Sequence, residues 1–416
     1  MAAPIEPTLE YAQQRDANDP LALFRERFHL LPDIIYMDGN SLGLLSRDAE
    51  AELLSALEQW KNRGVAGWFE GRQPWLDSAA SIGAMAAVMM GAAPDTVIAS
   101  STVTTNIHQL VGTFFAPQGA RRKILADELT FPSDLYALRS QLAIRGGDPD
   151  GDLLQAGSHD GRTLDEAAII EQMTDEVALI WLPSVLYRSG QLLDMERLTA
   201  AARERGIPIG FDCCHSAGVV PHEFDEWGVD FATWCSYKYL NSGPGGPAFL
   251  YVNRRHWDAQ PALTGWFGGK TGTMFDMSPE FDPDSGVGKW QISTPGILGA
   301  STLRGSLALI NEAGIDNLRA RSLDLTAYLI ALVDRRLARL DFRVGTPREA
   351  ERRGGHVAVE HERAAAICDE LIRRGVVPDF RPPDVIRICP SPLYGSFTEI
   401  WEVVQRLEAI VNEGAV

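Results

Sequence analysis

The sequence contains no apolar run that approaches the roughly 18 residues of a membrane helix, and its polar N-terminal stretch lacks the apolar core of a signal peptide. Its five cysteines show no CxxC spacing and no even framework. We therefore expect reduced, mostly buried thiols rather than disulfides or a metal site. Together these absences predict a cytoplasmic protein with no membrane partner.

A basic surface is also missing. The 416 residues carry a formal net charge of -18, which argues against nucleic acid or an anionic membrane as a partner. With 45% apolar residues, the chain can bury a large core, and its length favours a large domain with a smaller second one.

Lysine is scarce, and this scarcity has a chemical consequence. Lysine carries an amine that can form an imine with an aldehyde, whereas arginine does not. A Schiff-base enzyme with this sequence would have few candidates for the reactive amine. The lysines are Lys61, Lys123, Lys238, Lys270 and Lys289.

Short apolar runs alternate with amphipathic helical stretches from about residue 92 to 252. This pattern predicts an α/β domain with a mostly parallel sheet and helices on both faces. Ligands of such sheets bind at the carboxyl ends of the strands. The expected strands are Thr96–Ala99, Lys123–Ala126, Val177–Leu182, Ile207–Phe211, Phe231–Cys235 and Ala248–Val252, and Met195–Arg205 is one of the expected helices.

The C-terminal part predicts a small α+β unit, preceded by a largely helical stretch at Pro295–Leu340. We expect an N-terminal segment (1–45) that packs on the small domain or over the cleft. A large domain (46–300) and a small domain with a bridging helix (301–416) follow. The expected elements of the small domain are Gly355–Glu360, Arg363–Arg374, Val376–Phe380, Val385–Cys389 and Thr398–Val411.

Two candidate site residues follow consecutive strands. Asp212 closes the strand GIPIGFD, and Lys238 follows the strand FATWCS. A buried, unpaired carboxylate costs several kcal/mol, so Asp212 must have a strong partner. The plain alternative is a partly buried Asp212–Lys238 ion pair with no chemical role.

Two helix starts supply the other candidates. Thr104, Thr105 and Asn106 open an amphipathic helix, whose free N–H groups and hydroxyls suit a phosphate. Phe131 and Asp134 open another helix and could face a flat ring and its polar substituents. Ordinary N-capping and a core phenylalanine are the alternatives for these two segments.

Taken together, these features describe one ligand. A phosphate site, an aromatic face, an acid for a pyridinium nitrogen and a lysine for an aldehyde indicate pyridoxal phosphate (PLP). Their order along the chain resembles the aminotransferase-like fold, fold type I, of PLP enzymes. The stretch from Gly243 to Ala248 matches a dinucleotide fingerprint, but it leads into a strand rather than a helix, so that reading fails.

From about residue 20 to the C-terminus the chain resembles the kynureninase family in several strings that occur in the family's order. DGNSLG and YKYLN-GPG are the most specific of them. The strings are YMDGNSLG (36–43), FPSDLY (131–136), FDCCHSAG (211–218), SYKYLNSGPGG (236–246), GWFG (265–268) and SPLY (391–394).

The resemblance implies roles for residues that match the family's positions. Asp212 would pair with the pyridine nitrogen beside His215, Tyr237 would reach the phosphate and act as an acid, and Lys238 would form the Schiff base. Arg387 is the expected clamp for the substrate carboxylate. The implied cofactor contacts are Val103, Thr104, Phe131, Pro132, Ser133 and Asp134, with Trp266 and Thr294 from the second subunit of a homodimer; Asn40, Trp68 and Ser293 are implied substrate contacts.

One departure concerns the residue after the strand VALIWLP. Family members carry a Ser or Thr near the cofactor there, whereas this chain has Pro183. Either Ser184 substitutes for that residue, or the contact is missing.

The implied reaction is hydrolysis of L-kynurenine to anthranilate and L-alanine, with cleavage of the Cβ–Cγ bond, in tryptophan catabolism and NAD biosynthesis. Trp68 and Thr294 further imply a preference for kynurenine over 3-hydroxykynurenine, because an indole offers a ring hydroxyl no good partner and Thr294 lacks the amide of an asparagine. The Ser293-Thr294 pair combines the patterns of relatives that prefer one substrate or the other. The alternative for Trp68 is an ordinary core residue.

Two other functions stay open at this point. A cysteine desulfurase or related PLP lyase would need a reactive cysteine on a mobile loop, and neither Cys389 nor Cys213-Cys214 fits that position well. A non-catalytic PLP-binding protein would usually carry a DNA-binding or partner module, and we find neither a helix-turn-helix segment nor a basic patch.

Overall fold

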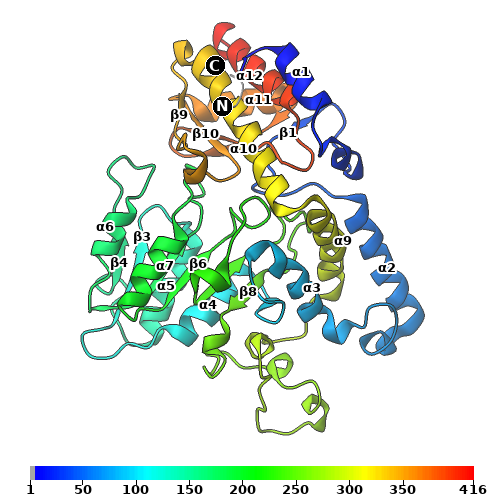
Figure 1. Ribbon diagram of the computed structural model, residues 1–416, viewed down its shortest axis with the longest axis vertical. Helices are drawn as coiled ribbons and strands as arrows, with labels where there is room; N and C mark the ends of the chain where they lie inside the picture. The colour runs from blue at the N-terminus through cyan, green and yellow to red at the C-terminus, as the bar shows by residue number, and fades with distance from the viewer. Residues whose placement is uncertain (1–4) are drawn as a thin grey trace.

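The computed structural model describes residues 5–416, which form a small domain stacked on a larger one (Figure 1). No helix in this part of the chain is long and apolar enough to cross a membrane. The helices are α1 (Leu9–Ala17), α2 (Arg47–Arg63), α3 (Ser78–Ala87), α4 (Val103–Phe114), α5 (Pro132–Ile144), α6 (Glu166–Glu171), α7 (Met195–Glu204), α8 (Phe224–Trp227), α9 (Ile297–Ala313), α10 (Ile315–Leu332), α11 (Ala364–Arg373) and α12 (Phe397–Asn412).

A seven-stranded sheet in the order β2-β8-β7-β6-β5-β3-β4 forms the centre of the large domain. Only β8 runs in the direction opposite to that of the other six strands. The predicted fold class, a mostly parallel sheet with a smaller second domain, is therefore confirmed. Its strands are β2 (Val97–Ala99), β3 (Lys123–Asp127), β4 (Leu153–Ala156), β5 (Val177–Pro183), β6 (Ile209–Asp212), β7 (Phe231–Trp234) and β8 (Phe249–Val252).

Helices cover both faces of this sheet. Apolar side chains of α4 and α5 pack on one face, and those of α3, α6, α7 and α9 pack on the other. The central strands are buried along their whole length, which explains their continuous apolar runs. The edge strand β4 was not predicted, because its sequence LLQA is only half buried and gives a weak pattern.

The small domain contains a four-stranded antiparallel sheet in the order β12-β13-β10-β9. The strand expected at Val376–Phe380 is instead two strands. Pro378 lies between them and has no N–H for a continuous ladder. The first pairs with the N-terminal segment and the second with the sheet. The strands are β1 (Ile35–Tyr36), β9 (Arg343–Val344), β10 (Val357–Glu360), β11 (Val376–Val377), β12 (Asp379–Arg381) and β13 (Val385–Ile388).

The domain division near residue 300 remains a proposal, and the packing favours a later point. The core around the large sheet includes α9 and continues to Leu318. The residues of α10 from Leu325 onward belong to the core of the small domain. The change of partner thus falls inside α10, which makes this helix the bridge between the two domains.

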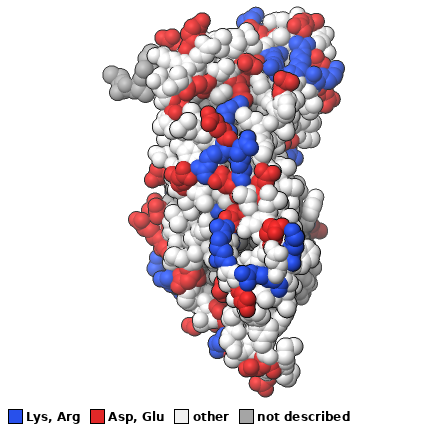
Figure 2. Space-filling model, turned by 90° about the vertical axis from the view of Figure 1, so that its right-hand side faces the viewer, with Lys and Arg blue, Asp and Glu red and all other residues white. Residues whose placement is uncertain are grey.

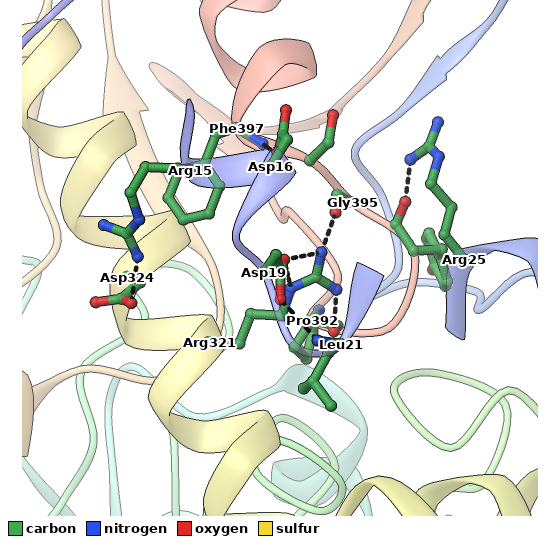
Figure 3. A network of polar contacts seen from close by, with 12 residues as sticks. Arg15, Asp16, Asp19, Leu21, Arg25, Arg321, Asp324, Pro392, Gly395 and Phe397 are labelled. Atoms are coloured by element: carbon green, nitrogen blue, oxygen red, sulfur yellow. Dashed lines mark hydrogen bonds and ion pairs between the residues drawn. The ribbon is translucent and has the colours of Figure 1, made fainter. Parts of the chain in front are cut away.

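The N-terminal segment is tied to the small domain by a polar network (Figure 3). Arg321 on α10 is buried and donates from Nε to Asp19 at 2.5 Å and from Nη2 to the Gly395 carbonyl at 3.0 Å. Asp16 accepts from the backbone N–H groups of Phe397 (2.8 Å) and Thr398 (2.9 Å) at the start of α12. These contacts hold the loop before α12 against the segment that leads into the DGNSLG string.

Charge is mixed on the face of the molecule that carries α2. Acidic and basic side chains lie interspersed there (Figure 2). In the first turn of α2, Asp48 pairs with Arg27 at 2.5 Å, and Arg27 also pairs with Glu312 at 2.6 Å. Arg27 thus has two acidic partners on this face.

Candidate active site

The carboxyl ends of β6 and β7 bring the predicted acid and lysine to the same edge of the large sheet. Asp212 is the last residue of β6, and Lys238 lies four residues beyond the end of β7. The Nζ atom of Lys238 contacts Nε2 of His215 at 3.0 Å. The simple Asp212–Lys238 ion pair is not the contact that the described chain forms.

His215 is a buried, neutral partner for this lysine. Burial and the positive charges of Lys238 and Arg387 keep the pKa of His215 well below its usual value. A neutral ring whose Nε2 accepts from the lysine carries its proton on Nδ1. Within residues 5–416, Nδ1 has no hydrogen-bonding partner. This nitrogen is available to a group that the protein itself does not supply.

Two carboxyl groups face each other beside this pair. Asp212 accepts from the Cys214 N–H at 2.7 Å, and Asp134 accepts from the indole N–H of Trp181 at 2.9 Å. Burial and the neighbouring charge of Asp212 raise the pKa of Asp134 well above its usual value. Asp134 therefore keeps its proton to a higher pH than an ordinary carboxyl group does. Asp212, which closes β6, is the acid predicted to pair with a ring nitrogen.

A third buried acid, Asp127, ends β3 close to these two. It accepts from the Leu129 N–H at 2.9 Å, and its second oxygen has no partner among the described residues. Burial raises the pKa of Asp127 to about 7. Nothing in the sequence of β3 distinguished this acid from a strand-terminal residue exposed to water.

The N-termini of α4 and α5 converge at a pair of hydroxyls. Thr104 Oγ1 and Ser133 Oγ lie 2.8 Å apart, and both are exposed to solvent. Val103 is the first residue of α4, and Thr102, not Thr104, is its N-cap. This frees the Thr104 hydroxyl for an anion, so the capping alternative does not hold for this residue.

Asn106 has a different role from the one suggested by its place at the helix start. Its amide donates to the carbonyls of Ser100 (3.0 Å) and Phe249 (3.3 Å) and to the Thr233 hydroxyl (3.3 Å). Asn106 is buried and fixes α4 to the sheet. It supports the anion site from behind and does not line it.

Phe131 stands at the start of α5 and is not a core residue. Its side chain is 44% exposed, and Pro132 takes the first helical position after it. The ring of Tyr187 meets it edge-on at 5.3 Å. The Phe131 side chain is thus accessible to a ligand, and its stacking on a planar ring stays a prediction.

Tyr237 lies beside Lys238 and connects two of the family-like strings. Its carbonyl accepts from the Gly43 N–H at 2.7 Å, which packs the DGNSLG string on the SYKYLN string. Burial and the neighbouring Cys235 and Cys214 raise the pKa of Tyr237. Its phenol therefore keeps its proton at neutral pH and is a donor.

Arg387 on β13 reaches the site from the small domain. It is 1% exposed and donates from Nη1 to the Tyr187 carbonyl at 2.7 Å and from Nη2 to Ser41 Oγ at 3.0 Å. Its Nη2 also pairs with Asp379. When the side-chain amide of Asn40 is flipped, so that its oxygen and nitrogen exchange places, its oxygen accepts from Arg387 Nε at 3.1 Å. Asn40 thus contacts the expected carboxylate clamp.

The remaining predicted residues are Trp68, Trp266, Ser293 and Thr294, and the two tryptophans belong to one aromatic cluster. Trp68 and Trp266 both pack on Phe267, with ring centroids 5.9 and 5.5 Å apart. Trp266 is 50% exposed, and Ser293 and Thr294 are exposed. No hydrogen bond, ion pair or aromatic contact within residues 5–416 joins this cluster to Lys238.

The end of β5 carries the proline that departs from the family pattern. Pro183 is the last residue of β5 and is buried. The hydroxyl of Ser184 donates to the Asp212 carbonyl at 3.1 Å and contacts Ser216 Oγ at 2.7 Å. Ser184 therefore holds the backbone of Asp212 and does not replace a cofactor contact.

Two residues that the sequence did not single out also lie here. His356 is fully buried, its ring is 5.7 Å from that of His215, and neither of its nitrogens has a partner in the described chain. Asp379 contacts Arg387 across two strands. No local motif marks either residue, because both reach the site through the pairing of the small-domain sheet.

These residues fit PLP. The paired hydroxyls at two helix N-termini suit its phosphate, the open face of Phe131 suits its ring, Asp212 suits its nitrogen, and the amine of Lys238 suits its aldehyde. Within the described residues no group of three or more His, Cys, Asp or Glu side chains could hold a metal ion.

Comparison with known proteins agrees with this geometry. Residues 318–407 match the family model of the kynureninase C-terminal domain. A kynureninase from Geobacillus thermodenitrificans is 53% identical over 409 residues, covering 98% of this chain and 96% of the relative. One from Bacillus thuringiensis is 51% identical, covering 99% and 96%.

Solved structures share the fold. A cysteine desulfurase from Thermococcus onnurineus matches with a TM-score of 0.80 at 16% identity, covering 94% of this chain and 98% of the other. A variant of C-DES with glycine covalently linked to its PLP cofactor matches with a TM-score of 0.81 at 18% identity, covering 92% and 98%. At this identity the similarity shows the fold alone.

Proposed function

The chain belongs to the kynureninase family, and we propose that the residues gathered around Lys238 hydrolyse L-kynurenine to anthranilate and L-alanine. Relatives about half identical over nearly the whole chain support this activity and PLP as its cofactor. The observation that carries the proposal is the contact of Lys238 with His215 beside the facing carboxyls of Asp134 and Asp212.

When bound, PLP supplies an electron sink for charge that develops at the substrate's α-carbon. Lys238 holds the aldehyde through its amine and, once released, takes the α-proton. His215 accepts a hydrogen bond from Nζ and so fixes where that amine lies between these two roles. Asp212 keeps a proton on the ring nitrogen by accepting its N–H.

The helix starts bind the phosphate in this proposal. Val103 and Thr104 supply it from α4, and Ser133 from α5. Phe131, with Pro132 behind it, covers one face of the ring. The phenol of Tyr237 donates to the phosphate or to the reacting substrate, because its raised pKa keeps it protonated.

Substrate selection falls to the small domain and to a second subunit. Arg387 binds the α-carboxylate through its planar N–H pair, with Asn40 holding the guanidinium. In a homodimer, Trp266 and Thr294 of one subunit complete the phosphate site of the other. Their exposure supports this arrangement, as does the lack of any hydrogen bond between them and Lys238 within residues 5–416.

We extend the proposal to the preferred substrate and to the compartment and pathway in which the enzyme acts. Trp68 and Ser293 line the aryl pocket, and the indole disfavours 3-hydroxykynurenine because a buried, unpaired hydroxyl is costly. Trp68 is half buried against Trp75 and Phe267, which supports a wall rather than a core residue. The enzyme acts in the cytoplasm, in tryptophan catabolism and NAD biosynthesis.

A cysteine desulfurase is disfavoured by a specific observation. All five cysteines are buried, and Cys389 contacts Tyr239 and the Gly355 carbonyl. None of them lies on an exposed loop where a thiolate could attack a substrate sulfur.

The function is tested by adding L-kynurenine to the PLP-loaded protein and following anthranilate fluorescence. We expect anthranilate and alanine in equal amounts, and no sulfide when cysteine is offered. Sulfide from cysteine, or binding of PLP without anthranilate formation, would contradict the proposal.

A further inference from the structure

We infer that Asp379 is a positioning residue of the carboxylate site, which fixes the guanidinium of Arg387 before the substrate arrives. The inference rests on the proposed role of Arg387 as the clamp for the α-carboxylate. It adds an acid to a site where only the arginine was expected.

The strand pairing places Asp379 opposite Arg387. Asp379 on β12 and Arg387 on β13 are direct partners in the antiparallel register. Residues two apart on a strand share a face, so Arg381 lies beside Asp379. One oxygen of Asp379, Oδ2, accepts from Arg381 Nε at 2.8 Å and also from Arg387 Nη2.

Arg387 has no solvent to compensate its charge. Its other partners are the neutral groups of Asn40, Ser41 and Tyr187. A buried guanidinium without a counter-ion is strongly unfavourable. The contact with Asp379 is the one ion pair that Arg387 makes within residues 5–416, and the Asp379 side chain is itself only 16% exposed.

A second acid lies close by but does not replace Asp379. Asp38 receives an N–H of Asn40 at 3.2 Å. Burial raises the pKa of Asp38 to about 6, and the charge of Asp379 contributes to the same direction. Asp38 makes no ion pair with Arg387 within residues 5–416, whereas Asp379 contacts it directly.

This arrangement holds the clamp without blocking it. The guanidinium has five N–H donors, and fixing its plane in advance lowers the ordering cost of ligand binding. A substrate carboxylate that takes an Nη2 hydrogen does not leave Asp379 unpaired, because Arg381 remains bonded to it. The double pairing lets Asp379 share Arg387 with the substrate.

The test is Asp379→Asn, with steady-state kinetics on L-kynurenine in the PLP-loaded enzyme. We expect KM to rise by about tenfold or more and kcat to change by less than about threefold. Without the charge of Asp379, the Arg387 guanidinium is no longer held in place and binds the substrate carboxylate more weakly. The matched control is Glu360→Gln, a buried acid in the same sheet that pairs with Arg162 instead. The control should leave KM unchanged.

A second measurement separates positioning from a general loss of structure. The probe is the amine that remains when the carboxylate is removed from kynurenine. Its inhibition constant should be equal in Asp379→Asn and the parent, since it makes no demand on Arg387. If the inhibition constant of the amine rises as much as the KM of kynurenine, the inference is wrong. An unchanged KM in Asp379→Asn would also overturn it. A lowered KM would overturn it too, because it would show that Asp379 competes with the substrate for Arg387.

Arg387→Lys distinguishes failure of the inference from failure of the proposed function. A point charge does not make the two-pronged contact, so its KM should rise strongly. If it rises and Asp379→Asn has no effect, the inference alone is wrong. If Arg387→Lys also leaves KM unchanged, the clamp role itself fails. Should Asp379→Asn not fold, Asp379→Glu, which moves the charge by one methylene, should still raise KM, and an unchanged KM would refute the inference.

Discussion

The amine of Lys238 and the imidazole of His215 lie 3.0 Å apart, with the second ring nitrogen of His215 unpaired in the described chain. The lysine amine thus has a neutral imidazole as its hydrogen-bond acceptor. This relationship sets the first of four predictions.

Lys238→Ala should lose both turnover and the visible absorbance of covalently held PLP. The other lysines are occupied elsewhere: Lys270 pairs with Asp282 at 2.6 Å, and Lys289 is buried against the Trp257 carbonyl. Absorbance spectra and peptide mapping after borohydride reduction check this. A reduced PLP adduct on Lys270 or Lys289 in the parent protein would show that the assignment is wrong.

Asp212→Ala should lower kcat by about a hundredfold or more while PLP retention falls much less. Without this acid the ring nitrogen loses its proton, but the hydroxyls of Thr104 and Ser133 still hold the phosphate. Turnover and cofactor content after dialysis are the two measurements. Near-normal turnover would mean that Asp212 serves only the fold.

Trp68→His should narrow or reverse the preference for kynurenine over 3-hydroxykynurenine, which we expect to be roughly tenfold in kcat/KM for the parent. A histidine offers the ring hydroxyl a partner that the indole lacks. Both substrates are compared side by side, with Phe69→His, one position away, as the control. An unaltered ratio in Trp68→His would assign the preference to other residues.

Asp127→Asn should stabilise the protein increasingly as pH rises from about 4 to about 7. The folded-state pKa of Asp127 is about 7, above its ordinary value of 3.8. The folded protein therefore binds this proton more tightly than the unfolded chain. Stability linked to it is fully present below about pH 4 and is lost as pH rises through about 7.

The measurement for Asp127→Asn is the difference in thermal midpoint between the variant and the parent, taken at about pH 5.0 and at about pH 7.5. The gain should be larger at the higher pH and level above it. The exposed Asp175→Asn is the matched control and should show no such trend. A gain that is equal at both pH values would exclude a buried, proton-binding Asp127.

Much of the site was predictable because it depends on local chain order. Parallel strands place their carboxyl ends together, so Asp212 and Lys238 had to meet at one edge. The helix starts at Val103 and Pro132 follow from capping and proline preferences. These features need no knowledge of how distant segments pair.

The parts that escaped prediction depend on pairing across the chain. Asp379 meets Arg387 because of the register between β12 and β13, and Pro378 separates β12 from β11. His356 reaches His215 only when the two domains are stacked. Neither contact is encoded in a spacing that a single sequence displays.

Tyr187 contacts a site residue of each domain. Its carbonyl bonds to Arg387 of the small domain, while its ring lies edge-on against Phe131 of the large one. One residue therefore joins the carboxylate clamp in the small domain to the aromatic side of the cofactor site in the large domain. The position of the Phe131 ring and the position of the Arg387 guanidinium are for this reason not independent of each other.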